Sequence, residues 1–468
     1  MMTVECVELQ TRAGELQPLV TGAVIDPCHP DYDTARQAWN LTVDQYPALV
    51  LMAESAEDIV EAVRFAREQG LGVAVQATGH GVRRLANDAL LINTSRMNQT
   101  RVDPEERTAY LEAGATWAPV LAEAQAHGLA PLLGSSPDLG AIGYTLGGGY
   151  GWLGRKYGLS CDSVRYFEVV LADGSQVRAS RDENTELFWG LRGGGGSLGV
   201  VTGMEVDLYP VSMVYGGNLF YPAEDAQEVF ARYREWIEAM PEEMTSSVGL
   251  VNVPPLPDFP EPIRGKSFVL VRGCYAGPLD EGEALVNTWR EWRTPALDMF
   301  GPMPFSEVAE ISQDPPDPTP ARVDGAWLRD LSDEAVETLI RFTLPQGGPP
   351  PIVMLEVRQA GGAVTRVEPE AAAYSIRDGA LLMEVVAIPF MPELVPVVEQ
   401  HLAALKEALA PHLTGKVYLN FVEGPDAHKV IAQGYSDDAY GRLRDLKTAL
   451  DPDNLFGYSF NIEPLPKG

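Results

Sequence analysis

Glycine is concentrated in three short runs in the first half of this chain. They are Thr78-Gly79-His80-Gly81, the segment 140–154 with Gly147-Gly148-Gly149 at its centre, and Gly193-Gly194-Gly195-Gly196. Glycine adopts positive φ without strain and lets backbone amides approach a ligand closely. Successive exposed amides form concavities that bind anions such as pyrophosphate. A single run can equally build a tight turn, but three runs in one half of the chain favour a nucleotide cofactor.

The spacing GxGxxG, which marks NAD-binding Rossmann domains, occurs twice. The copies are Gly149, Gly151 and Gly154, and Gly194, Gly196 and Gly199. The motif requires a strand, a turn and a helix in that order. The first copy is followed by the short, broken segment 155–158, and the second by a predicted strand over 200–208. An NAD-dependent dehydrogenase is therefore an alternative that the pattern disfavours.

The first half of the chain predicts short strands and helices in alternation. The first forty residues show no regular pattern, and residues 46–52 then predict a strand. Ser55 predicts the N-terminal cap of a helix that Gly70 ends. Residues 71–75 predict the next strand, and a glycine run follows it directly. Asp173-Gly174 between apolar runs predicts a β-hairpin.

The middle of the chain has a different pattern. Between about residues 211 and 413, predicted helices alternate with predicted strands, and proline-rich loops interrupt them. The helices are expected at 224–239, 281–291, 333–341 and 395–409, and the strands include 267–272, 353–357 and 381–386. This pattern is typical of an α+β domain in which helices cover a sheet.

Charge and composition argue against several kinds of partner. The chain has 468 residues and a formal net charge of −31, which disfavours nucleic acid and anionic membrane surfaces because both attract Lys and Arg. No apolar run is long enough to span a membrane, and no leader is recognisable. The four cysteines are scattered, so neither a disulfide framework nor a metal site is predicted. We expect a cytoplasmic protein of more than one folding unit, in an unspecified oligomeric state.

Five segments form an ordered set of motifs. They are Val75-Gln76-Ala77-Thr78-Gly79-His80-Gly81, then Ser136-Pro137-Asp138-Leu139-Gly140 with Tyr144-Thr145-Leu146-Gly147-Gly148-Gly149, then the segment 188–202, then Gln359-Ala360-Gly361-Gly362, and finally Tyr418-Leu419-Asn420-Phe421 with Asp451-Pro452-Asp453-Asn454. In this order they resemble the berberine-bridge-enzyme-like FAD-linked oxidases of the vanillyl-alcohol-oxidase (PCMH-type FAD-binding) superfamily. The resemblance covers residues 46–462 and implies an α+β, two-domain flavoprotein with an inserted antiparallel sheet backed by helices.

The resemblance implies that both chain ends build the flavin domain. Residues 1–212 would form the FAD-binding domain, 213–414 the substrate-binding domain, and 415–468 a C-terminal segment that completes the FAD domain. The residues implied to bind FAD are Gln76, Ala77, Thr78, Gly79, His80, Gly81, Ser136, Asp138, Leu139, Gly140, Gly143, Tyr144, Gly147, Gly148, Gly149, Gly199, Val201, Asn420 and Asn461.

His80 is the residue that the resemblance links covalently to the 8α-methyl group of FAD. A lone histidine is more often structural, but His80 lies in a glycine loop at a strand end within the matched motif, which favours the covalent link. Many relatives add a second link through a cysteine where this chain has Ser136, and a serine hydroxyl cannot replace that thiolate. We therefore predict a single covalent link. In this family the position of Leu139 controls oxygen access, and a side chain larger than valine goes with slow reaction with oxygen. The position of Tyr144 contacts N1 and C2=O of the flavin. Either residue can alternatively serve packing alone.

The resemblance leaves the catalytic base open. Relatives that oxidise alcohols often carry a tyrosine at the position of Phe421, and phenylalanine cannot accept a proton. General base catalysis is worth roughly 10²- to 10⁴-fold, so another group should supply it. Tyr418, expected on one strand face with Asn420, is the predicted base, and Gln359 is predicted to orient the substrate. Glu356 and Glu384 are interpreted as solvated or ion-paired carboxylates.

The predicted function is that of an FAD-dependent oxidoreductase. It would transfer a hydride from a C–H bearing a hydroxyl or amine, in a small sugar, alcohol or secondary metabolite, to N5 of FAD. Oxygen or another acceptor would then take the electrons. A flavin-binding protein without catalysis is the alternative, and Phe421 is the argument for it.

Overall fold

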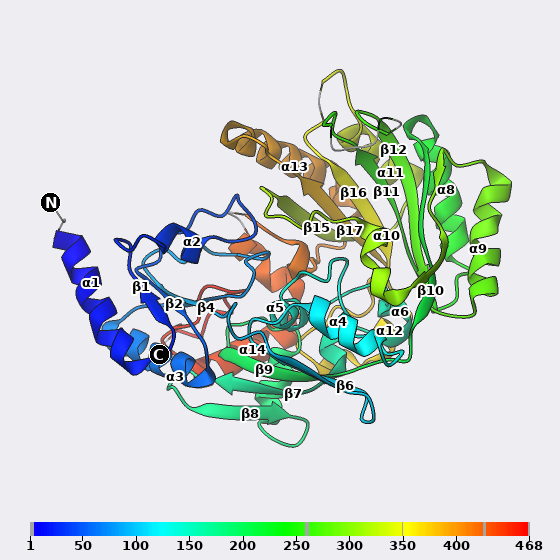
Figure 1. The fold of residues 1–468 in the computed structure, drawn as a ribbon. Coiled ribbons are helices and arrows are strands. Elements are labelled where there is room, and N and C mark those ends of the chain that lie inside the picture. Colours follow the sequence, from blue (N-terminus) through cyan, green and yellow to red (C-terminus); the bar gives the residue numbers. More distant parts are fainter. Residues whose placement is uncertain (1–3, 258–260, 262, 349, 425–426, 467–468) are drawn as a thin grey trace.

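The two ends of the chain share one side of the molecule, and its middle forms the other (Figure 1). The computed structural model describes residues 4–257, 261, 263–348, 350–424 and 427–466. Within these ranges the strands form three sheets, two of them from strands before residue 208 and the third from strands between residues 213 and 387. The predicted α+β fold with an inserted antiparallel sheet is confirmed.

The first sheet ends one of its strands at the first glycine run. Its order is β1-β2-β4-β3, with β2 and β3 parallel to β4; the bounds are Ala23–Ile25, Leu49–Met52, Leu90–Asn93 and Val73–Gln76. Helix α3 (Ala56–Gln69) connects β2 to β3. Its ends are those predicted, since Ser55 Oγ accepts the amide of Asp58 at 3.2 Å and Gly70 is left-handed at φ 67°.

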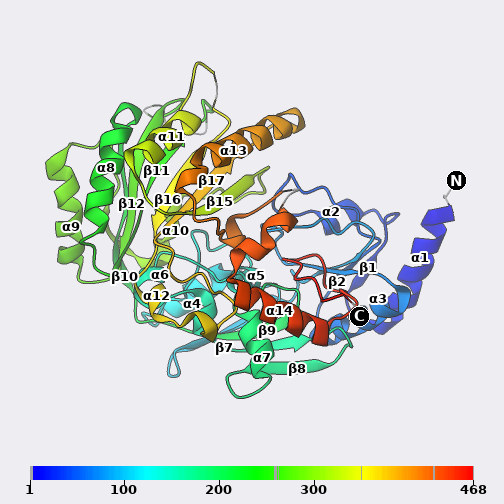
Figure 2. The same cartoon turned by 180° about the vertical axis from the view of Figure 1, so that it is seen from behind.

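The second sheet is antiparallel and has the order β5-β6-β9-β7-β8. The strands are Thr100–Asp103, Thr108–Glu112, Val200–Asp207, Val164–Val170 and Gln176–Ser180. The predicted hairpin joins β7 to β8, with Gly174 at φ 79°. Helices α4 (Trp117–Gln125), α5 (Ala141–Leu146) and α7 (Thr185–Leu191) pack with this sheet. Helix α14 (Asp437–Leu450), from the C-terminal end, contacts α7, as Figure 2 shows.

The inserted sheet has the order β13-β10-β12-β11-β16-β17-β15, and β14 also pairs with β10. The strands are β10 Met213–Pro222, β11 Met244–Asn252, β12 Ser267–Tyr275, β13 Leu297–Asp298, β14 Gly301–Pro304, β15 Arg322–Leu328, β16 Met354–Gln359 and β17 Leu381–Ala387. Helices α8 Ala226–Ile237, α9 Leu279–Trp292, α11 Asp333–Thr343 and α13 Val395–Leu409 cover its outer face (Figures 1 and 2). Alternate residues therefore face opposite environments: Val357 belongs to the apolar cluster beneath the helices, whereas Glu356 and Arg358 form ion pairs on the other face.

Two predictions of local structure are wrong. The first forty residues contain helices α1 (Val4–Leu16) and α2 (Tyr32–Arg36) besides β1, because contacts with α3 and the first sheet stabilise short segments whose own periodicity is weak. Residues Leu419–Phe421 form a 3₁₀ turn and not a strand. The carbonyl oxygens of Leu419 and Asn420 accept hydrogen bonds from Arg83 and not from a neighbouring strand.

Cys28 is disulfide-bonded, which the spacing of the cysteines did not predict. Cys161 and Cys274 are buried free thiols, and burial raises the pKa of each.

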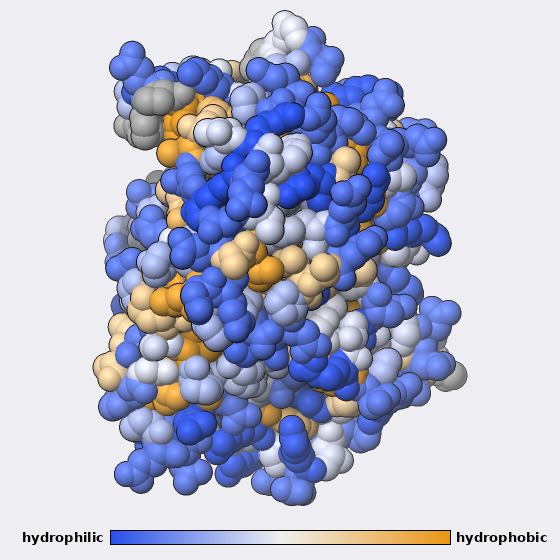
Figure 3. All heavy atoms as spheres, turned by 90° about the vertical axis from the view of Figure 1, so that its right-hand side faces the viewer, coloured by the Kyte–Doolittle hydropathy of each residue, from blue (hydrophilic) through white to orange (hydrophobic). Residues whose placement is uncertain are grey.

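The surface in Figure 3 is mostly hydrophilic, with scattered apolar side chains. Among the described helices, none is both long and apolar enough to cross a membrane. The described His, Cys, Asp and Glu side chains form no cluster suited to a metal ion.

Candidate functional site

The first two glycine runs meet in space. Residues 77–81 follow β3, and Gly140 precedes α5. A Cβ added at Gly140 would lie 3.4 Å from Cβ of Ala77 and 3.5 Å from Oγ1 of Thr78. Gly79 has φ +80°, and a Cβ there would lie 2.7 Å from Cα of Ala38. The loop can therefore pack against residues 38–39 in this conformation only because Gly79 carries no side chain.

The C-terminal segment enters the same region through Asn420. Its Nδ2 donates to the carbonyl oxygen of Tyr144 at 3.0 Å, and a Cβ at Gly147 would lie 1.9 Å from its Oδ1. The third glycine run contacts the chain end as well, because the amide of Gly196 donates to Oγ of Ser459 at 3.1 Å. Segments from both chain ends thus converge on one site.

Several polar atoms around this site are buried without a partner in the part of the chain that the structure describes. They are the hydroxyl of Tyr144, Oδ1 of Asn461, and Nε and Nη1 of Arg83. Burial raises the pKa of Tyr144 well above its ordinary value, so its hydroxyl is a neutral donor. Buried polar atoms normally have partners. These atoms, a phenol, an amide and a cation, fit a ligand with a polar ring edge and phosphate groups, which is the composition of FAD.

Arg83 was missed in the sequence, although it stands only three positions after His80. Its Nη2 donates to the carbonyl oxygen of Leu419 at 2.9 Å. Burial lowers the pKa of Arg83. Arg83 therefore ties the first glycine loop to the C-terminal segment and leaves the nitrogen atoms Nε and Nη1 for a bound anion.

Tyr418 lies at the centre of a set of hydrogen-bond donors. Its hydroxyl oxygen accepts hydrogen bonds from the amides of Gly149 (3.1 Å) and Tyr150 (2.9 Å) and from Nδ2 of Asn420 (3.0 Å). The side chain is 1% exposed. Burial raises the pKa of Tyr418 to about 12, although the three donors oppose that rise. Tyr418 and Asn420 meet as predicted, but through a 3₁₀ turn and not through one face of a strand.

His80 is held by two neighbours. Its Nδ1 lies 2.8 Å from Oγ1 of Thr78, and its ring stacks on Trp39 with centroids 4.1 Å apart and planes 15° apart. Burial lowers the pKa of His80 to about 4, so the imidazole is neutral at pH 7. Trp39 was also missed, because it stands in the segment that showed no pattern.

Phe421 faces a buried group of charges. Cζ of Arg358 lies 4.9 Å from the centre of its ring, and Arg358 bonds Glu356 at 2.8 Å and Glu384 at 2.6 Å. Burial would raise the pKa of Glu356, but Arg358 and Arg272 hold it at about 2. Burial raises the pKa of Glu384 to about 7. Of the two interpretations, ion pairing is confirmed and solvation is wrong.

Gln359 turns its side chain away from Arg358. Its Nε2 donates to the carbonyl oxygen of Ile237 at 3.0 Å, and its Oε1 accepts from Ser246 at 3.3 Å. The backbone carbonyl oxygen of Gln359, by contrast, accepts a hydrogen bond from the hydroxyl of Tyr150. The structure therefore brings Arg358, and not the Gln359 carboxamide, to the side chain of Phe421.

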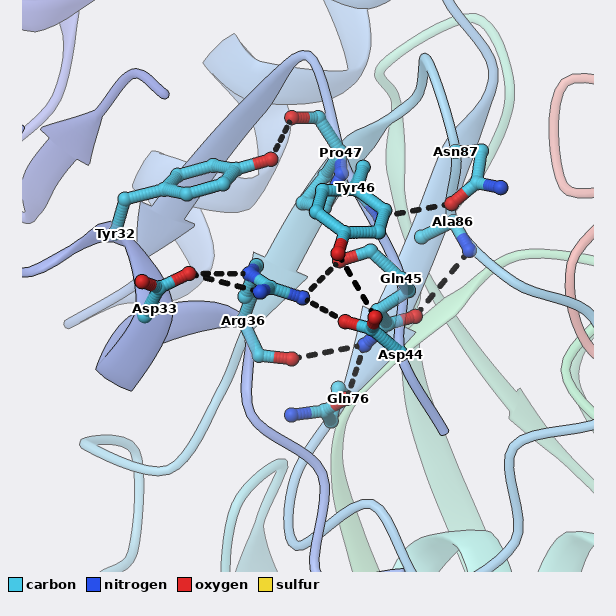
Figure 4. A network of polar contacts seen from close by, with 10 residues as sticks. All are labelled: Tyr32, Asp33, Arg36, Asp44, Gln45, Tyr46, Pro47, Gln76, Ala86 and Asn87. Carbon is cyan, nitrogen blue, oxygen red and sulfur yellow. Dashed lines mark hydrogen bonds and ion pairs between the residues drawn. The ribbon is translucent and has the colours of Figure 1, made fainter. Parts of the chain in front are cut away.

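The side chain of Gln76 is committed to the network in Figure 4. Its Oε1 accepts from Nε2 of Gln45 at 2.8 Å, and its Nε2 donates to the carbonyl oxygen of Gln37 at 2.9 Å. Gln45 also bonds the carbonyl oxygen of Arg36. Gln76 thus anchors the strand end before the glycine run and offers only its backbone to a ligand.

The remaining predicted residues line the two loops or support them. Oγ of Ser136 accepts the amide of Asp138 at 3.2 Å, and Leu139 is partly buried against the main core. A Cβ at Gly143 would meet nothing within 4 Å, whereas one at Gly199 would lie 2.7 Å from Val169. Close packing of β9 against β7 therefore accounts for Gly199.

Comparison with known proteins supports FAD as the cofactor. The family described as FAD binding domain matches residues 47–180, and the family described as berberine and berberine like matches residues 417–463. The chain is 27% identical to the FAD-linked oxidoreductase YgaK of Bacillus subtilis, over 95% of this chain and 98% of that one. It is 27% identical to (R)-6-hydroxynicotine oxidase of Paenarthrobacter nicotinovorans, over 95% and 97%.

Solved structures share the whole fold. The structure of 6-hydroxy-D-nicotine oxidase from Arthrobacter nicotinovorans superposes with a TM-score of 0.82 at 23% identity, over 95% of this chain and 98% of that one. Xylooligosaccharide oxidase from Myceliophthora thermophila superposes with a TM-score of 0.83 at 22% identity, over 98% and 100%. The two family matches and the full-length relatives show that the chain is an FAD-dependent oxidoreductase that is similar to the berberine-bridge-enzyme-like proteins.

Proposed function

We propose that the protein removes a hydride from a small-molecule carbon that bears a hydroxyl or amine, in a sugar, alcohol or secondary metabolite. Bound FAD supplies the hydride acceptor, and oxygen or another acceptor takes the electrons. The observation that carries this proposal is the hydroxyl oxygen of Tyr418 within reach of three N–H donors. Relatives named for oxidising hydroxynicotine, xylooligosaccharides and chitooligosaccharides support this substrate range.

Tyr418 is the proposed base, and it accepts the substrate proton as the phenolate. Phe421 cannot do so. Hydrogen bonds to the charged form of a group favour that form, and the amides of Gly149 and Tyr150 are fixed by the backbone, so they need no reorganisation as charge develops. Asn420 adds the third donor. The Arg358 guanidinium lies beside Phe421, but its ion pairs with Glu356 and Glu384 offset its positive charge.

We propose that residues 1–212 and 415–468 hold FAD and that 213–414 hold the substrate. The break between the second and the inserted sheet, after Asp207 and before Met213, supports the first boundary. Tyr144 and Arg83 would bind polar groups of FAD with the atoms that lack protein partners. The backbone of residues 77–81 and 147–149 would contact it; Gly79 and Gly147 let these loops approach Ala38 and Asn420 closely, which brings segments from both chain ends to the same site.

We propose further that His80 forms a single covalent bond to FAD. In the net reaction a C–N bond forms between an imidazole nitrogen and the 8α-carbon, and one N–H and one C–H bond break. The two protons and two electrons go to dioxygen, which becomes hydrogen peroxide. The neutral imidazole, with its pKa of about 4, has a lone pair available for this bond at pH 7. Ser136 adds no second link, since a serine hydroxyl is a much weaker nucleophile than a cysteine thiolate.

Two further assignments concern the reaction of the reduced flavin with oxygen and the location of the protein in the cell. Leu139 is proposed to slow the reaction with oxygen, and its position directly before Gly140, partly buried against the main core, supports this role. The cytoplasmic location remains a prediction from the sequence. The disulfide at Cys28 argues against it, because disulfides persist mainly in oxidising compartments. Fractionation of the source cells tests it.

An anaerobic screen tests the proposed reaction. The purified holoprotein is mixed with sugars, alcohols and amines in turn, and flavin absorbance is followed. Bleaching by at least one compound with a hydroxyl- or amine-bearing C–H is expected. Flavin that stays oxidised with all three classes would instead support a flavin-binding protein without catalysis.

A further inference from the structure

We propose that Trp39 is a positioning residue that holds the imidazole of His80 in place for its covalent attachment to FAD. The loop 315–320 of the inserted part would in turn hold Trp39. This inference rests on the proposed link through His80. It concerns a residue that neither the family motifs nor the sequence patterns single out.

The geometry of His80 supports the positioning role. An aromatic stack with planes 15° apart and centroids 4.1 Å apart restricts the tilt of the imidazole ring. The contact between Nδ1 and Oγ1 of Thr78, at 2.8 Å, restricts rotation of the ring within its plane. Together Trp39 and Thr78 leave the ring a single orientation.

The backbone of Trp39 belongs to the same assembly. Its amide donates to the carbonyl oxygen of Thr78 at 2.9 Å, and the amide of Asn40 donates to the carbonyl oxygen of Gly79 at 3.4 Å. The segment therefore pairs directly with the two residues before His80. A shift of Trp39 would move the loop and the stacked ring together.

The other side of Trp39 contacts the inserted part of the chain. Its indole Nε1 donates to the carbonyl oxygen of Pro316 at 3.3 Å, and its carbonyl oxygen accepts from the amide of Thr319 at 3.2 Å. The amide of Leu41 donates to the carbonyl oxygen of Thr319 at 3.1 Å. Residues of the loop 315–320 thus hold the ring that His80 stacks on, although Pro316 lies 277 positions from Trp39 in the sequence.

Orientation of this kind affects rate. Aligning a nucleophile with the atom it attacks removes a large part of an activation barrier, and small displacements of that nucleophile cost about 10- to 100-fold in rate. Burial also lowers the pKa of His80 and keeps it neutral. If Trp39 served stability alone, replacing it would lower the free energy of unfolding but would leave the rate of bond formation in the folded protein unchanged.

The test measures covalent flavin and not turnover. Apoprotein produced under riboflavin limitation is mixed with excess FAD, and samples are precipitated with acid at intervals. The flavin retained in the washed pellet gives the rate of attachment. The variants are Trp39→Leu, which removes the aromatic ring, and Trp39→Phe, which keeps one. Leu41→Ala is the matched control, because that side chain is 45% exposed on the same segment.

We expect Trp39→Leu to slow attachment by about 10-fold or more, Trp39→Phe to stay within about threefold of wild type, and Leu41→Ala to match wild type. Thermal unfolding of each apoprotein is measured alongside, and Trp39→Met replaces Trp39→Leu if the latter does not fold. Attachment at the wild-type rate in the ring-less variant, or equal losses in Trp39→Phe and Trp39→Leu, would overturn the inference. A wild-type pellet without flavin would overturn the His80 link itself, whatever Trp39 does.

Discussion

Replacing Tyr418 by phenylalanine tests the centre of the proposed site. The substitution keeps the ring and removes one oxygen atom, the shared acceptor of the Gly149 and Tyr150 amides and of Asn420 Nδ2. Each buried donor left without an acceptor costs about 1–3 kcal/mol. The free energy of unfolding should therefore fall by about 3 kcal/mol or more. Losing the base should also lower the rate of flavin reduction by roughly 10²- to 10⁴-fold.

Both effects are measured on the holoprotein. Urea unfolding gives the stability, and anaerobic stopped-flow absorbance gives the rate of flavin reduction by a substrate found in the screen. Tyr435→Phe is the matched control for stability, because that buried hydroxyl makes one hydrogen bond, to the carbonyl oxygen of Gly193 at 3.1 Å. It should lose only about 1 kcal/mol. An unchanged reduction rate in Tyr418→Phe would remove Tyr418 as base, and a stability loss no larger than that of Tyr435→Phe would contradict the three-donor geometry.

Four further outcomes are expected. His80→Ala should release all flavin into the acid supernatant, whereas wild type retains it in the pellet; retention by the variant would point to another attachment residue. Because Tyr418 acts as the phenolate and burial raises its pKa to about 12, kcat/KM should rise about tenfold per pH unit between about pH 7 and 10, and a plateau near neutrality would contradict this. Leu139→Val should speed reoxidation of reduced flavin in air, measured by stopped flow, and a slower rate would refute its proposed role. Gly147→Ala should weaken FAD binding to apoprotein in a fluorescence titration, since its Cβ would lie 1.9 Å from Oδ1 of Asn420; unchanged affinity would mean that this close approach is unimportant.

Local sequence signals were sufficient where the interactions are local. The cap at Ser55, the left-handed Gly70 and the Asp173-Gly174 hairpin each involve residues a few positions apart, and all are confirmed. Helix α13 has the predicted bounds, 395–409, because its apolar face repeats regularly along the sequence. The N-terminal helices α1 and α2 were not predicted, because contacts with neighbouring elements, such as that of α1 with α3, stabilise them.

Side-chain roles in the site were less predictable. Tyr418 and Asn420 were paired by an alternation that the chain does not have there, yet they meet through a 3₁₀ turn. Gln359 stays a predicted substrate-orienting residue; its carboxamide bonds Ile237 and Ser246, and the neighbouring Arg358, which the sequence did not single out, faces Phe421. Which of two adjacent residues points into a site depends on the register of the strand, and register is set by pairing with distant strands.

The sequence by itself determined the class of cofactor and the order of the loops that hold it. Glycine is required at position 79 by its positive φ and at position 147 by the close approach of Asn420, and both requirements are met by the residue type. Only the tertiary structure decided what meets at the site: Trp39 on His80, Arg83 beneath the C-terminal segment, and three donors on Tyr418. These contacts join residues as far as 336 positions apart in the sequence. No local pattern encodes them, because the two partners of each contact come together only when the chain folds.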